Sequence, residues 1–109
     1  MIKIIFLYDK EKNICGFKTK GHAGYAESGK DIICSAVSML TMNTVNSMEQ
    51  LTEDDFNLEM NEKKGILDLK IKDKPSMEAM LLLNSMKLGI DMIHNQYGDK
   101  YIRIESKEV

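Results

Sequence analysis

Alternation of apolar and polar side chains along this chain predicts five short β-strands. The first two cover residues 2–8 and 14–19, and the polar run between them is typical of a hairpin turn. Apolar residues alternate again over 56–60 and 66–71, on either side of a turn that contains lysine and glycine, which predicts a second hairpin. Residues 101–104 are the fifth strand.

Two segments have helical spacing instead. Apolar residues recur three and four positions apart over 31–51, where Asp31 is a suitable N-cap. Pro75 is expected in the first turn of a second helix, which Gly98 ends. The order ββαββαβ predicts an α+β fold with two helices packed on a mostly antiparallel sheet. With 109 residues, the chain is expected to form a single domain, 1–109.

The second predicted helix is apolar on two faces. One stripe consists of Ala79, Leu82, Leu83, Met86, Ile90 and Ile93. The other consists of Met77, Met80, Leu81, Leu88 and Met92. A helix that is apolar on two sides has to be buried on both, either between layers or against another subunit. We therefore expect a homodimer.

Composition and charge exclude several classes of protein. The net charge is −2 and the basic residues are scattered, which argues against an RNA-binding module that grips the phosphate backbone. The apolar stretches are too short and too often interrupted by charge to span a bilayer, and the N-terminal residues do not resemble an export signal. Two cysteines without a CxxC spacing and two distant histidines favour neither a disulfide nor a metal site. We expect a cytoplasmic protein that uses no metal and contacts neither membrane nor nucleic acid.

The candidate chemistry lies where the second strand gives way to the first helix. His22 follows the strand, and Cys34 is the third residue of the helix, with a glycine-rich loop over residues 20–30 joining them. A helix N-terminus favours the thiolate and lowers its pKa, and its free N–H groups can stabilise an oxyanion. An imidazole nearby could serve as the base, so the pattern fits a cysteine hydrolase. The residues alone leave a second interpretation open, because free cysteines often simply fill a core.

Two further residues are candidates for supporting roles. Asp31 either caps the helix or orients His22 as the third member of a triad. Ser38 is one turn beyond Cys34 on the same helical face, where it bonds near the site or back to the helix backbone. The glycine-rich loop is expected to act as a lid that closes over a bound substrate. An apolar pocket for a substrate side chain is expected, with walls formed by residues of the two helices.

Two runs of this chain carry the signature of a known family, GHA at 21–23 and GKDIICSAVS at 29–38. They resemble the bacterial ribosomal-processing cysteine protease family, Prp, and the likeness extends over essentially the whole chain. The resemblance implies that His22 is the base and Cys34 the nucleophile, supported by Gly21, Asp31 and Ser38. It also implies a dimer without a cofactor.

The resemblance implies a substrate as well. Proteases of this family remove a short hydrophobic N-terminal extension from the twenty-seventh protein of the large ribosomal subunit, cutting after phenylalanine during ribosome maturation. The alternative is a non-enzymatic, dimeric ribosome-assembly adaptor that binds a basic ribosomal protein through its acidic surface, with Cys34 as core filler. The two differ in whether Cys34 is chemically activated.

Overall fold

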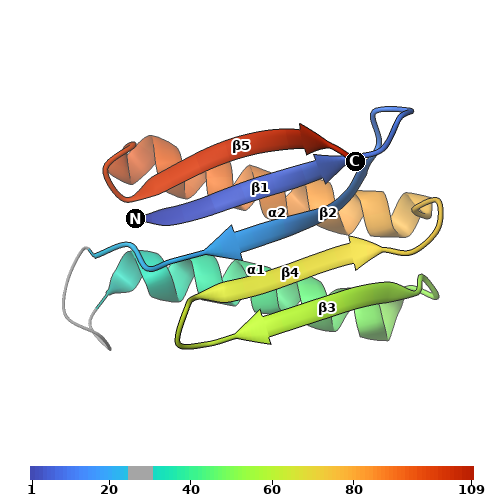
Figure 1. Cartoon of the computed structure of the whole chain (residues 1–109), viewed down its shortest axis with the longest axis horizontal. Coiled ribbons are helices and arrows are strands. Elements are labelled where there is room, and N and C mark those ends of the chain that lie inside the picture. The colour runs from blue at the N-terminus through green and yellow to red at the C-terminus, as the bar shows by residue number, and fades with distance from the viewer. Residues whose placement is uncertain (25–30) are drawn as a thin grey trace.

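The computed structural model of the chain describes residues 1–24 and 31–109. Two helices lie on one face of a five-stranded sheet, as Figure 1 shows, so the predicted α+β class and the order ββαββαβ are confirmed. The elements are β1 (Ile2–Tyr8), β2 (Ile14–Lys20), α1 (Ile32–Leu51), β3 (Phe56–Asn61), β4 (Ile66–Ile71), α2 (Met77–Tyr97) and β5 (Ile102–Glu108).

The sheet is mixed, with strand order β3-β4-β2-β1-β5. Every neighbouring pair is antiparallel except β1 and β5, which run parallel from Ile2↔Ile102 to Tyr8↔Glu108. Strand β5 is thus longer than the predicted 101–104. The polar half of this strand was missed because it lies at the sheet edge, where side chains stay exposed and the apolar alternation fades.

The core lies between the sheet and the two helices. Alternate residues of β1 are buried there, namely Ile2, Ile4 and Phe6. Strand β2 adds Phe17, which pairs with Phe6 across the ladder. Burial of two phenylalanines among aliphatic side chains is a large share of the apolar area that stabilises a domain of this size. The same packing fixes the end of β2 over the start of α1 (Figure 1).

Helix α2 begins slightly later than predicted. Ser76 is its N-cap and accepts a hydrogen bond from the Ala79 N–H (3.0 Å), so Pro75 precedes the helix instead of occupying its first turn. The serine hydroxyl satisfies a free N–H of the first turn, a bond that proline cannot make. Gly98 ends the helix as predicted, with its N–H bonded to the His94 carbonyl.

The two apolar stripes of α2 differ in burial. The buried residues of the helix all belong to the first stripe, being Ala79, Leu83, Met86 and Ile90. In the second stripe Met77, Leu81, Leu88 and Met92 are exposed. The expected burial of α2 on both sides is therefore not achieved within one chain. None of the helices in the described ranges has the length and apolar character needed to cross a membrane.

Candidate active site

The start of α1 places Cys34. The Asp31 carboxylate accepts hydrogen bonds from the backbone N–H groups of Ile33 and Cys34, each at 3.0 Å, which confirms Asp31 as the N-cap. Because the helix begins at Ile32, Cys34 is its third residue, as the sequence predicts. Asp31 is nearly fully buried, so the cap also locks the end of the helix against the sheet.

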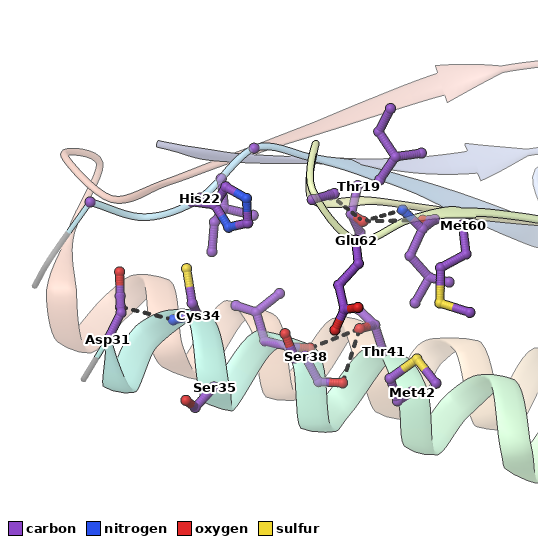
Figure 2. A pocket seen from close by; sticks show the side chains of 17 residues that line it. Thr19, His22, Asp31, Cys34, Ser35, Ser38, Thr41, Met42, Met60 and Glu62 are labelled. Carbon is purple, nitrogen blue, oxygen red and sulfur yellow. Dashed lines mark hydrogen bonds between the residues drawn. The ribbon is translucent and has the colours of Figure 1, made fainter. Parts of the chain in front are cut away.

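The chain leaving β2 passes directly over the Cys34 sulfur. The Ala23 N–H donates a hydrogen bond to Sγ of Cys34 (3.0 Å), and Figure 2 shows the His22 ring on the same side of the site, above the thiol. Nε2 of His22 bonds instead to the main-chain carbonyl of Lys63, at 3.1 Å. No hydrogen bond joins the imidazole of His22 to the thiol of Cys34. The structure thus brings the two residues to one site in a resting arrangement.

The environment of the thiol favours its protonated form. Burial raises the pKa of Cys34 most, the Ala23 N–H lowers it, and the Asp31 carboxylate raises it through a hydrogen bond and its charge. The sequence led us to expect a lowered pKa from the helix N-terminus. The difference arises because burial of the thiol, together with the anionic cap that starts the helix, outweighs the groups that lower the pKa of Cys34. In this resting state the nucleophile would need a base to remove its proton.

Replacing Asp31 by asparagine tests this electrostatic account. Asparagine is also a good N-cap, so helix α1 should persist, while loss of the carboxylate removes two of the effects that raise the pKa of Cys34. We expect Asp31→Asn to move the pH midpoint of Cys34 alkylation by iodoacetamide to lower pH and to increase its rate at neutral pH. Peptide mass spectrometry reads Cys15 separately as an internal control, since Asp31 does not affect its pKa. A midpoint that stays or rises would contradict the account.

The remaining predicted site residues also lie here. Gly21 has φ +89°, and a Cβ on it would lie 2.5 Å from the Met1 carbonyl oxygen, so a side chain is excluded. Ser38 is exposed on α1 beside the site, with its carbonyl accepting from the Thr41 hydroxyl (3.2 Å). Of the lid expected over residues 20–30, residues 25–30 lie outside the described part of the chain, so the lid stays a prediction.

A pocket of about 1100 Å³ opens beside Cys34. Its walls include the N-terminal half of α1 and the β3–β4 hairpin. Figure 2 shows Met42 on the helix and Met60 and Glu62 on the hairpin. The expectation that both helices wall the pocket holds for α1 and is wrong for α2, because none of the described lining residues comes from α2. Periodicity placed Met60 on a strand but could not show that the hairpin folds over α1.

The described residues include no cluster of three or more metal-ligating side chains. His94, the second histidine, lies late in α2 and bonds to Asp99, away from the pocket lining. Cys15 is buried in β2. The pKa of its thiol is raised, and burial is the largest cause of that increase. The chemistry of the site therefore has to come from Cys34, His22 and the backbone around them.

A thiol on the first turn of a helix, a histidine beside it and a pocket along the same helix define a cysteine hydrolase, and the chain is a cysteine protease. A family model described as cysteine protease Prp matches residues 1–103, and the chain belongs to this family.

Its relatives agree in sequence and in structure. The ribosomal processing cysteine protease Prp of Staphylococcus aureus (strain Mu50) is 26% identical over 98% of this chain and 100% of its own length. That of Bacillus subtilis (strain 168) is 27% identical over 91% of this chain and 92% of its own. A crystal structure of the S. aureus protease with a covalently linked product peptide has a TM-score of 0.91 at 26% identity, covering 98% of this chain and 100% of that one. Another, with a substrate peptide, has a TM-score of 0.86 at 25% identity, with the same coverage.

Proposed function

We propose that this cysteine protease removes the short hydrophobic N-terminal extension of the twenty-seventh protein of the large ribosomal subunit, cutting after phenylalanine, with Cys34 as nucleophile and His22 as base. The observation that carries the proposal is the Cys34 sulfur at the head of a pocket large enough for a peptide segment, beneath His22. The S. aureus relative has been solved with a substrate peptide and with a covalently linked product peptide, which supports a peptide substrate here.

The reaction follows from this geometry as acyl transfer. His22 takes the proton of the Cys34 thiol, and the sulfur attacks the carbonyl carbon of the peptide bond to be cut. The imidazolium then gives its proton to the leaving amine nitrogen, and the C–N bond breaks to leave a thioester. A water molecule, deprotonated by His22, attacks the thioester and releases the carboxylate and the free thiol. One proton thus passes through His22 when the thioester forms, and one when it is hydrolysed.

The oxyanion needs a donor other than the one the sequence suggested. The N–H groups of Ile33 and Cys34 are occupied by the Asp31 carboxylate, and that of Ser35 by the Asp31 carbonyl. The Ala23 N–H already points at the Cys34 sulfur, at 3.0 Å. We assign the oxyanion to it, because attack by the sulfur brings the carbonyl oxygen within its reach.

The pocket suits an aromatic side chain next to the cut. Met42 and Met60 face it from α1 and β3, and Val37 contributes a buried aliphatic wall. Methionine side chains adapt to a ring and make favourable sulfur–aromatic contacts. A phenylalanine can thus be held beside the sulfur by apolar contact on both sides.

A peptide experiment tests the proposed substrate. A peptide with the N-terminal residues of the ribosomal protein from the same organism is incubated with the protein, and the products are identified by mass spectrometry. We expect a single cut after phenylalanine and no cut in a peptide with that phenylalanine replaced by aspartate. If the folded protein cuts neither peptide, the proposed substrate is refuted. The remaining interpretation would then be that the protein binds this ribosomal protein as an adaptor without cutting it.

We also propose that the protein is a cytoplasmic homodimer that pairs through the exposed stripe of α2. Leu81 is 71% exposed on this stripe. Met39 on α1 is 72% exposed and lies outside the stripe, so it serves as the control position. We expect Leu81→Lys to reduce the mass measured by light scattering from twice 12.4 kDa to 12.4 kDa, and Met39→Lys to leave the dimer intact. A wild-type mass of one chain at micromolar concentration would disprove the dimer.

A further inference from the structure

The turn between β3 and β4 reaches the catalytic face and touches the segment that carries His22. Strands β2 and β4 pair up to Thr19↔Leu67, and the contact then continues beyond both strands through the Gly21 N–H, which donates to the Lys64 carbonyl (3.0 Å). The residue that precedes His22 is therefore part of the same hydrogen-bonded unit as the turn. This contact joins segments more than forty positions apart and was not visible in the sequence pattern.

Two glycines make the approach possible. Gly65 has φ +64°, and a Cβ on it would lie only 2.2 Å from the Gly21 carbonyl oxygen. Any side chain at Gly65 would push the turn away from Gly21, and an L-residue would be strained there whatever the space. The missing side chain of Gly65 thus lets the two backbones come close enough for the turn to reach the histidine.

The turn is also anchored from the side of the sheet. The buried Thr19 hydroxyl accepts from the Leu67 N–H (3.0 Å) and donates to the Leu67 carbonyl (3.1 Å). A side chain that bonds both groups of a facing residue fixes where β4 begins, and with it the position of the turn. The Lys63 carbonyl is consequently held in place and does not belong to a freely moving loop end.

The bond from this turn to His22 settles which ring nitrogen is the base. Nε2 lies 3.1 Å from the Lys63 carbonyl oxygen, and a carbonyl oxygen can only accept. Nε2 must therefore carry a proton and donate it, which leaves the lone pair of the neutral ring on Nδ1. The Asp31 carboxylate, expected as a possible orienting group, accepts from Ile33 and Cys34 instead.

We propose that the main-chain carbonyl of Lys63 positions His22 for catalysis, in the role that a third side chain fills in a catalytic triad. This rests on the proposed function of His22 as base. The Lys63 carbonyl holds the tautomer in which Nδ1 accepts the thiol proton. It stays bonded to Nε2–H while the ring is an imidazolium, and Nδ1 then passes that proton to the leaving amine. Because the orienting group is backbone, substitution of the Lys63 side chain does not remove it.

An amide-to-ester exchange tests the proposal at the atom concerned. Replacing Lys64 by its α-hydroxy acid through chemical ligation turns the Lys63 carbonyl into an ester carbonyl, a weaker acceptor, and leaves every side chain in place. The exchange also removes the Lys64 N–H, which donates to the Asn61 side chain (3.2 Å). Asn61→Ala removes that same bond and keeps the Lys63 amide carbonyl, so it is the matched control.

We expect the ester to lower kcat for the phenylalanine-containing peptide about tenfold with little change in KM, and Asn61→Ala to stay within about twofold of wild type. A folded ester protein with the kcat of the Asn61→Ala control would overturn the role of the Lys63 carbonyl. A wild-type protein that cuts no peptide would instead refute the proposed function, and the two failures are thus distinguishable.

A second pair of variants needs no chemical synthesis. Gly65→Ala is expected to lower kcat as well, because the turn is displaced from His22. Gly98→Ala carries a comparable backbone strain at φ +86° with nothing within 4 Å of its Cβ, and it lies far along the chain from the turn. Equal kcat values in these two variants, both folded by circular dichroism, would likewise count against the proposal.

Discussion

Cys34→Ala is expected to abolish peptide cleavage, with a loss in kcat of about 10⁴-fold or more. Without the sulfur no thioester forms, and the remaining site can only bind the peptide and polarise its carbonyl. A purely structural explanation of this loss is unattractive, because Cys34 is partly exposed on the first turn of α1 and alanine removes only the sulfur atom from its packing against the core. The measurement is the rate of product formation by mass spectrometry, beside thermal melting of the same sample.

The second cysteine provides the control for this variant. Cys15 is buried in β2, so Cys15→Ala tests a loss of thiol without a change at the site. We expect some loss of stability in Cys15→Ala and undiminished cleavage by the folded fraction. Cleavage by Cys34→Ala at a rate near that of wild type would move the nucleophile to another residue.

His22→Ala is expected to lower cleavage of the peptide by about 10²- to 10⁴-fold, the usual contribution of general acid–base catalysis. The loss has two parts that can be separated. Because the pKa of the Cys34 thiol is raised in the resting state, the sulfur needs a base before it can attack. The leaving amine also needs a proton, whereas the phenolate released from an aryl ester does not.

Comparing the two kinds of substrate across pH resolves these parts. At high pH the thiol of His22→Ala ionises without a base, so we expect hydrolysis of an aryl ester to recover. Amide cleavage should not recover, because no group protonates the amine. His94→Ala is the matched control, since the second histidine bonds to Asp99 at the far end of α2 and should leave both activities unchanged. Parallel losses of ester and amide hydrolysis at every pH would contradict the assignment of His22 as the acid.

The local half of the site was predictable from the sequence. A short carboxylate before a helical apolar pattern is a strong N-cap signal, and it placed Cys34 on the first turn correctly. The hairpins and the buried stripe of α2 followed from periodicity in the same way. In each case the information lies within a few residues of the element that it determines.

The other half depends on contacts between distant segments. The register Thr19↔Leu67 places the β3–β4 turn against Gly21 and His22, and no local pattern encodes that pairing. The same register folds the hairpin over α1, so the hairpin forms the pocket wall that the sequence had assigned to α2. The raised pKa of Cys34 has a related reason, because burial of the thiol, its largest cause, depends on the same distant contacts, and the charge of Asp31 adds to it.

The parallel pairing of β1 with β5 has a consequence for the time at which the enzyme is assembled. It joins Ile2 to Ile102, so β1 is made long before the neighbour that covers this edge. Contacts this distant in sequence slow folding, because closing so long a loop costs entropy before the contact forms. Until β5 pairs, β1 keeps an open edge beside Met1, whose carbonyl oxygen lies close to Gly21. We expect proteolytic activity to appear only after β5 has paired with β1.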